Sequence, residues 1–187
     1  MSKFDYSLLK SVGNDVVISP NAEFRRPQLV SIGNHVAIDT AYITTAADIG
    51  DYVHIGPYVS IIGGPKAHFT MGNFTNLAAG CRVVCVSDKH MGDGLIGPAT
   101  IPDQYKDELD MGQVVMKNFV NVGTNAVILP GVTLAEGTVI GACSLVTKNT
   151  EPWTIYTGIP AKPVKVRPRE KMLRYAQELG YPAKAGG

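Results

Sequence analysis

The sequence predicts an all-β fold, a parallel β-helix of about six coils, with a long inserted loop and a C-terminal α-helix. Three observations lead to this prediction: apolar residues that recur every six positions, turn-forming residues between them, and one long segment without the repeat. The repeats occupy most of residues 1–150, which we treat as one coil domain with an insertion at 87–113. Residues 151–187 then form a C-terminal extension.

The six-residue repeat is clearest after residue 115. Large apolar residues occupy every sixth position there: Met116, Val122, Ile128, Leu134, Ile140 and Val146. A series of smaller residues follows each by four positions: Val120, Ala126, Val132, Thr138, Ser144 and Thr150. Neither the 3.6-residue period of a helix nor the two-residue period of a flat strand produces this pattern. A coil of short strands joined by corners does produce it.

Earlier blocks of the chain continue the same spacing, separated by small slips. Their apolar positions are Val12, Ile18, Phe24 and Val30, then Ile43, Ile49, Ile55 and Ile61, then Met71, Leu77 and Val83. Turn-forming pairs such as Gly33-Asn34 and Thr124-Asn125 lie between them. About eighteen hexads, three to a triangular turn, give roughly six turns. A β-sandwich would instead require strands in which apolar and polar residues alternate, with hairpin turns about every 8 to 12 residues. We find neither feature.

Two segments interrupt the repeat, a short one at 62–70 and a long one at 87–113. Long unpatterned loops on a compact scaffold often carry function. The longer segment contains Asp88, His90 and Tyr105. We therefore expect it to contribute to a functional site.

The C-terminal extension is expected to leave the coil after Thr150 and to form a helix over about 168–180. The apolar face of this helix would contain Met172, Leu173, Ala176 and Leu179. From residue 148 onward, five Lys and three Arg stand against three Glu, a local net charge of +5. Basic charge is therefore concentrated near the end of the chain.

The composition of the chain indicates its cellular compartment and excludes some classes of partner. The whole chain of 187 residues has a net charge of +1, which leaves no basic field for nucleic acid. Three Cys cannot all pair, which indicates a reduced protein. The opening segment MSKFDYSLLKSVGNDV is too polar for a signal peptide, and no apolar run is long enough to span a membrane. We expect a cytoplasmic protein without membrane insertion.

The segments VILPGV, GACSLVTK and GIPAKPVK, in this order, resemble the closing coils of the hexapeptide-repeat acyltransferases. The most similar branch holds sugar O-acetyltransferases, nucleotide-aminosugar N-acetyltransferases and xenobiotic acetyltransferases, and the resemblance covers roughly residues 30–167. It implies a left-handed parallel β-helix, a homotrimer with active sites between subunits, and acetyl-CoA as the donor. It also implies a small-molecule sugar or nucleotide sugar as acceptor.

The resemblance further implies where the donor binds. Small residues let the pantetheine arm approach the coil wall, and lysines supply positive charge for the phosphates of CoA. The residues expected to contact CoA are Gly123, Ala142, Lys148, Pro160, Ala161, Lys162 and Lys165. An ordinary solvated basic face is the alternative role for these lysines.

Acetyl transfer requires a base near the acceptor, and histidine suits that role at neutral pH. His90 lies at the mouth of the insertion, close to where many family members carry a catalytic His before Pro. This sequence reads Ser87-Asp88-Lys89-His90 instead, so the correspondence is imperfect. His54 is the second candidate because it closes the hexad begun at Ile49 and points away from the core. Asp88, alone or with His54, is the third.

Two further residues are candidates for substrate contact, Asn76 on a preceding coil and Tyr105 in the insertion, where it could form part of a lid. His35 is expected to lie on the surface, and His68 is a weaker candidate for touching substrate. We expect no metal, because Cys81 and Cys85 need not converge in the hexad phase.

Several functions remain open on this scaffold. We favour N-acetylation of a nucleotide-linked amino sugar for surface glycan (lipopolysaccharide) biosynthesis, because an amine tolerates an unusual base better than a hydroxyl does. O-acetylation of a sugar or antibiotic hydroxyl is the main alternative. A non-enzymatic scaffold is a third possibility. A zinc hydratase of the γ-carbonic-anhydrase type, with His54, His68 and His90 as ligands, is the fourth.

Overall fold

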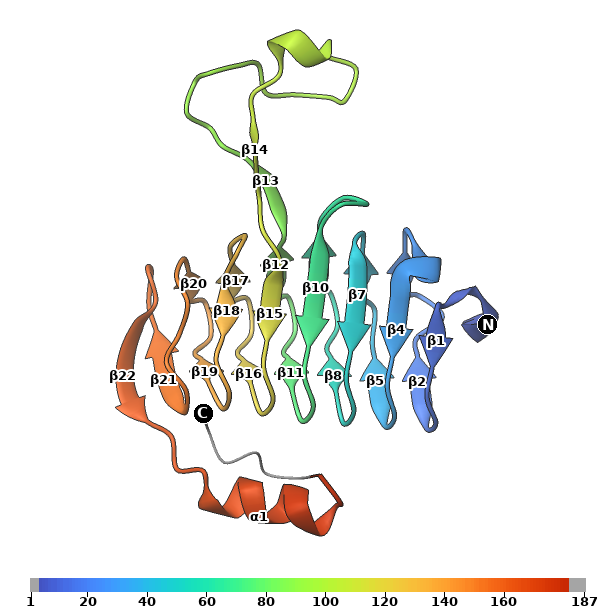
Figure 1. Cartoon of the computed structure of the whole chain (residues 1–187), viewed down its shortest axis with the longest axis vertical. Helices are drawn as coiled ribbons and strands as arrows, with labels where there is room; N and C mark the ends of the chain where they lie inside the picture. The colour runs from blue at the N-terminus through green and yellow to red at the C-terminus, as the bar shows by residue number, and fades with distance from the viewer. Residues whose placement is uncertain (1–3, 182–187) are drawn as a thin grey trace.

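A computed structural model describes residues 4–181 and confirms the parallel β-helix (Figure 1). The first face of the prism, sheet A, consists of β1 (Ser11–Val12), β4 (Val30–Ile32), β7 (Ala46–Ile49), β10 (His68–Met71), β15 (Val114–Met116) and β18 (Thr133–Leu134). The second, sheet B, consists of β2 (Val16–Ile18), β5 (Val36–Ile38), β8 (His54–Ile55), β11 (Asn76–Leu77), β16 (Asn121–Val122), β19 (Val139–Ile140), β21 (Thr154–Thr157) and β22 (Lys162–Val166). The third, sheet C, consists of β3 (Glu23–Phe24), β6 (Tyr42–Ile43), β9 (Ser60–Ile62), β12 (Arg82–Val84), β17 (Val127–Ile128) and β20 (Leu145–Val146).

These strands form six complete three-stranded turns, and β21 begins a seventh. Short 3-10 helices occur at η1 (Tyr6–Leu8) and η2 (Pro27–Leu29). We expected the coil to end at Thr150, but β21 still pairs in parallel with β19, so the solenoid continues to Thr157. The next strand, β22, then turns back and pairs with β21 in the antiparallel sense.

The predicted inward positions form the core. All twelve residues of the two series after residue 115 are buried, and Val122 and Ile128 are fully enclosed. Stacking explains this burial, because the strand register places Leu77 between Ile55 and Val122 of the neighbouring turns. The prediction is wrong for Val12, which is 38% exposed. Its strand β1 is the first of sheet A and has a neighbour on one side alone.

The corners between sheets A and B carry a feature that we did not predict. Five side chains, which we call the aromatic ladder, stack one above another there: His35, Tyr52, Phe74, Phe119 and Trp153. All five have positive φ angles between 51° and 62°. Ring centroids of neighbours lie 4.5–5.6 Å apart.

The C-terminal helix α1 (Glu170–Glu178) lies below the coil (Figure 1), and its residues Met172 and Ala176 line a pocket together with the ladder rings of Phe74 and Phe119. It lies within the predicted span, and Ala176 of its apolar face is buried whereas Leu179 is 53% exposed. Tyr181 makes edge contacts with the ladder rings of Tyr52 and Phe74, and its hydroxyl donates to Asp51 Oδ2 at 2.7 Å. That hydrogen bond, together with burial, raises the pKa of Tyr181 to about 12.

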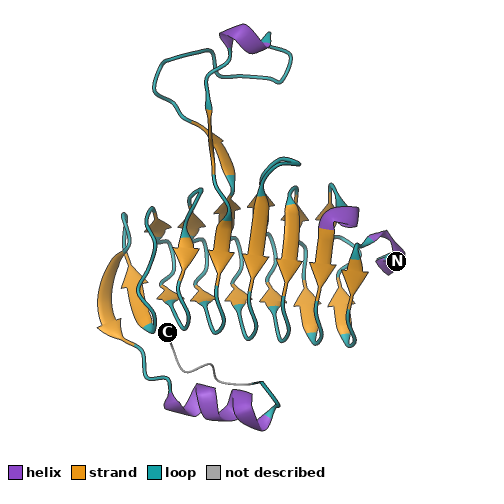
Figure 2. Ribbon diagram, in the orientation of Figure 1, coloured by secondary structure: helices purple, strands orange, loops and turns teal. Residues whose placement is uncertain are grey.

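The insertion leaves sheet C after β12 and returns to sheet A at β15 (Figure 2). Its two ends form an antiparallel stalk, β13 (Val86–Asp88) with β14 (Leu109–Met111), where we expected a loop. The 3-10 helix η3 (Asp103–Tyr105) lies beyond the stalk. Among the described residues, no helix is long and apolar enough to span a membrane.

Candidate functional site

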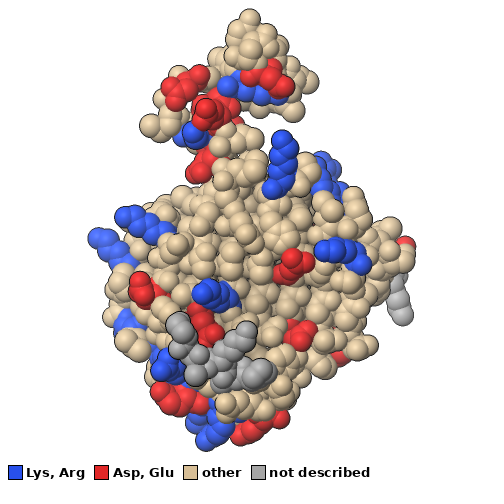
Figure 3. All heavy atoms as spheres, in the orientation of Figure 1, with Lys and Arg blue, Asp and Glu red and all other residues tan. Residues whose placement is uncertain are grey.

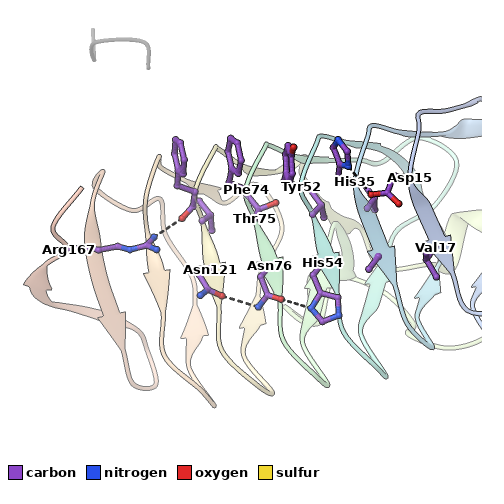
Figure 4. A pocket seen from close by; sticks show the side chains of 15 residues that line it. Asp15, Val17, His35, Tyr52, His54, Phe74, Thr75, Asn76, Asn121 and Arg167 are labelled. Atoms are coloured by element: carbon purple, nitrogen blue, oxygen red, sulfur yellow. Dashed lines mark hydrogen bonds and ion pairs between the residues drawn. The ribbon is translucent and has the colours of Figure 1, made fainter. Parts of the chain in front are cut away.

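His54 lies on the outer face of sheet B, as its hexad position predicts, and lines a groove of about 580 Å³ (Figure 4). Its Nδ1 lies 3.0 Å from Asn76 Oδ1, and its Nε2 lies 3.1 Å from Asp39 Oδ2. Asn76 in turn donates from Nδ2 to Asn121 Oδ1 at 3.0 Å. The structure therefore brings together two of the predicted site residues, His54 and Asn76.

This arrangement makes His54 a poor base. A general base needs a ring nitrogen whose lone pair faces the incoming proton. Both nitrogens of His54 already face oxygen atoms of the chain, so one hydrogen bond must break before the ring can accept a proton from substrate. The groove wall also holds Arg167, which donates to the backbone oxygens of Phe119 and Gly137 at 2.7 and 3.0 Å. Burial lowers the pKa of Arg167.

Asp39 and Asn121 also belong to this hydrogen-bonded group and were not predicted. Asn121 had a usable signal, because it directly precedes an inward residue, as His54 and Asn76 do. Residues at that position point outward and stack in register across β8, β11 and β16. Asp39 follows β5, and its position in the six-residue repeat does not mark it in this way.

Asp88 ends the first strand of the stalk, opposite Leu109, and its side chain is half-buried. Within residues 4–181 its carboxylate makes no hydrogen bond or ion pair. The neighbouring Lys89 is engaged by Glu108, whose hydrogen bond and charge raise the pKa of Lys89. A half-buried carboxylate without an internal partner is available to an amine or ammonium group of a ligand.

His90 lies just beyond Lys89 at the outer end of β13, is exposed, and has a φ angle of 57°. It lies two residues from Asp88 along the chain, so both belong to the same end of the stalk. Tyr105 lies in η3, farther out on the insertion, and is 57% exposed. Figure 3 shows that acidic and basic side chains gather on the insertion, above a largely uncharged face of the coil.

The remaining histidines lie apart from one another on this chain. His68 lies on sheet A with its Nε2 2.9 Å from Asp48 Oδ2, and His35 pairs with Asp15 at the edge of the groove. The three ligands of the zinc-hydratase alternative, His54, His68 and His90, thus occupy two sheets and the insertion. In the part of the chain that the structure describes, no three His, Cys, Asp or Glu residues are grouped to hold a metal ion.

The small residues predicted to line the CoA track do gather at one corner. A Cβ atom on Gly123 would lie 2.6 Å from Ala142 N, so these two residues stack in successive turns. Ala161 donates its N–H to Leu145 O at 2.7 Å, which places the cis-Pro160 turn beside β20.

The three lysines do not share that corner. Lys162 begins β22 next to Ala161, whereas Lys165 lies farther along β22, opposite Ile155. Lys148 follows the far end of β20. All three are exposed. Only Lys162 therefore lies directly beside the line of small residues, and the other two approach different parts of the surface.

No family model matches the sequence. The dTDP-4-amino-4,6-dideoxy-D-glucose acyltransferase of Escherichia coli is 36% identical over 165 residues, which cover 86% of this chain and 84% of the relative. The chain belongs to the hexapeptide-repeat acyltransferases. The sequence-based prediction of this family is thereby confirmed.

Solved structures agree with this membership. A variant of AntD, an N-acyltransferase from Bacillus cereus in complex with dTDP-4-amino-4,6-dideoxyglucose and coenzyme A, has a TM-score of 0.86 at 34% identity, covering 92% of this chain and 91% of AntD. AntD is also known with dTDP and 3-hydroxybutyryl-CoA. The hexapeptide-repeat acetyltransferase VCA0836 of Vibrio cholerae shares the fold at 20% identity, with a TM-score of 0.56 and coverage of 86% and 75%. The predicted left-handed β-helix is confirmed.

Proposed function

We propose that this hexapeptide-repeat acyltransferase transfers an acetyl group from acetyl-CoA to the amino group of a dTDP-linked amino sugar. One observation carries the proposal: the chain is similar, over most of its length, to a dTDP-4-amino-4,6-dideoxy-D-glucose acyltransferase and to an N-acyltransferase solved in complex with that nucleotide sugar and coenzyme A. The sequence alone had left open both the nucleotide and the choice between amine and hydroxyl. The relatives favour dTDP and an amine.

In the reaction, the neutral amine attacks the thioester carbonyl, the carbon–sulfur bond breaks, and CoA leaves as its thiol. An amino sugar is largely protonated near neutral pH, so one proton must leave the ammonium group before attack. The chain offers Asp88 for this step because its carboxylate is half-buried and makes no hydrogen bond or ion pair within residues 4–181. His90, two residues away, is the alternative base, and His54 is disfavoured by its two hydrogen bonds.

The donor is proposed to lie along the corner formed by Gly123, Ala142 and the Pro160-Ala161 turn. Lys162 is best placed to reach its phosphates, because it directly follows this turn. Lys148 and Lys165 would each serve a different part of the CoA molecule. Asn76 and Tyr105 stay proposed substrate contacts.

The same proposal includes a cytoplasmic homotrimer with active sites between subunits and a product used for surface glycan synthesis. The family resemblance supports both parts. The stalk of β13 and β14, which carries Asp88, projects from the coil (Figure 1), and this supports the assembly because a neighbouring subunit could complete a site there.

Thiol release from acetyl-CoA tests the proposal across a panel of acceptors. The panel contains dTDP-4-amino-4,6-dideoxyglucose, its 4-hydroxy counterpart, the matching UDP-linked amino sugars and a virginiamycin-type antibiotic. Because AntD binds 3-hydroxybutyryl-CoA, that donor is run beside acetyl-CoA. Release with the dTDP-linked amine is expected. Release with hydroxyl acceptors alone would favour O-acetylation, and no release with any acceptor would favour a scaffold.

A further inference from the structure

A second groove, of about 350 Å³, lies on the outer face of sheet C, away from His54. Its floor follows one row of the sheet, in which Glu23, Tyr42, Ser60 and Arg82 pair in successive strands, so that Glu23 and Arg82 lie at opposite ends of the row. Tyr58, from the corner that precedes β9, forms part of its wall. Arg82 belongs to β12, the strand from which the insertion leaves, so the groove runs up to the foot of the stalk that carries Asp88.

Tyr58 has an unusual backbone for its size. The corner between sheets B and C has positive φ angles at equivalent positions of four turns, occupied by Tyr58, Gly80, Asn125 and Cys143. Glycine and asparagine tolerate this conformation, whereas a bulky residue is strained in it. Tyr58 has a φ angle of 59°.

Packing does not explain the choice of tyrosine at this position. At the corner between sheets A and B, the aromatic residues with positive φ stack in the ladder beside α1, and that packing accounts for them. Tyr58 is 72% exposed and stacks on no other ring within residues 4–181. Strained residues without a packing role are typical of ligand sites.

Arg82 is held in place by backbone oxygens. Its Nη1 donates to the carbonyl oxygens of Tyr58, at 3.1 Å, of Gly80, and of Cys81, at 3.3 Å. It makes no ion pair with a carboxylate among the described residues. Nη2 and Nε have no hydrogen-bond partner in that part of the chain. A guanidinium that is fixed on one edge and open on the other is suited to binding phosphate oxygens in pairs.

We propose that this groove binds the nucleoside diphosphate part of the acceptor, with the base against Tyr58 and Tyr42 and the pyrophosphate on Arg82. This inference rests on the proposed function. Tyr42 and Arg82 lie two turns apart, about 10 Å at the usual strand spacing, which matches the reach from a base to its β-phosphate. The sugar would then continue from Arg82 toward the stalk and Asp88, on the side of the insertion away from the proposed CoA track.

Direct binding of dTDP and of coenzyme A, each measured by titration calorimetry, tests this assignment in the full-length protein. Arg82→Gln is expected to weaken dTDP binding by roughly 10- to 100-fold, as the loss of a charged hydrogen-bonding group does. Tyr58→Asn keeps a residue that tolerates the backbone but removes the ring, and should weaken dTDP binding by roughly 5- to 50-fold. Tyr58→Phe, which keeps the ring, and Arg174→Gln on α1 are the matched controls and should bind dTDP normally.

Coenzyme A affinity should stay within about twofold in all four variants, because its proposed track lies elsewhere. Normal dTDP binding by both Arg82→Gln and Tyr58→Asn would overturn the assignment while leaving the proposed function intact. Equal loss of dTDP and CoA binding would also overturn it, because the effect would then lack selectivity. If the unaltered protein binds CoA but no dTDP, the proposed function itself fails.

Discussion

Replacement of Asp88 by Asn tests the role of the stalk in catalysis. The change keeps the size of the side chain and removes its charge. Because the Asp88 carboxylate makes no hydrogen bond or ion pair within residues 4–181, folding should not depend on it, and the melting temperature should stay unchanged. If Asp88 accepts the proton of the substrate ammonium, turnover should fall by about 10²- to 10⁴-fold, the usual contribution of a general base.

The pH dependence separates this role from a general loss of binding. Without a base, the variant must wait for substrate that is already neutral, and that fraction rises about tenfold per pH unit below the pKa of the amine. The deficit of Asp88→Asn should therefore shrink as the pH rises. Thiol release measured with a disulfide reagent at several pH values gives the profile. Asp110→Asn, an exposed residue on the second strand of the same stalk, is the control.

Two results would exclude Asp88 as the general base. Turnover of Asp88→Asn within about threefold of the unaltered enzyme at neutral pH would remove Asp88 from the proton transfer, since general-base catalysis contributes far more. A large deficit that stays constant with pH would indicate a binding or structural role instead. A loss in His90→Ala with an intact Asp88→Asn would transfer the role to His90.

Leu77→Ala should lower the free energy of unfolding by about 3 to 5 kcal/mol, because the turns above and below Leu77 prevent the cavity from collapsing. Chemical denaturation measures this free energy. Leu8→Ala, at an exposed position, is the control and should be almost neutral. The pKa of Tyr181 rises to about 12 in the folded protein. The hydrogen bond of Tyr181 therefore contributes fully to the stability of the folded state below about pH 10, the ordinary pKa of tyrosine, and this contribution is lost as the pH rises through about 12. Near-ultraviolet circular dichroism should show this transition, and Tyr181→Phe should abolish it. Cys143 should react with a thiol reagent well before the two other cysteines, because it is exposed whereas burial raises the pKa of Cys85 to about 11; equal rates for all three thiols would contradict the packing.

The core could be predicted from the sequence because stacking turns impose a strict period on inward residues. Leu77 and Val122 belong to turns separated by the insertion, yet both keep the hexad position that buries them. The aromatic ladder could not be predicted in this way. Phe74 and Phe119 touch in space, but the insertion separates them by 45 residues, so the ladder has no constant spacing in the chain.

The site was predicted less completely than the core. The outward direction of His54 followed from its hexad position, but its contacts with Asp39 and Asn76 depend on which turns are neighbours. Arg82 and Tyr58 could not be predicted as site residues, because an exposed Arg and an exposed Tyr are common on any surface. Their proposed role depends on the backbone oxygens that hold the Arg82 guanidinium and on the positive φ angle of Tyr58. Neither feature can be predicted from the sequence.

Acylation of an amine on a dTDP-linked sugar can be tested on the product itself. The most direct measurement is mass spectrometry of the product formed from acetyl-CoA and dTDP-4-amino-4,6-dideoxyglucose, followed by treatment with hydroxylamine. We expect one added acetyl group that resists hydroxylamine, as an amide does. An acetyl group that hydroxylamine removes would identify an ester and contradict N-acylation, and an unmodified sugar would contradict the proposed substrate.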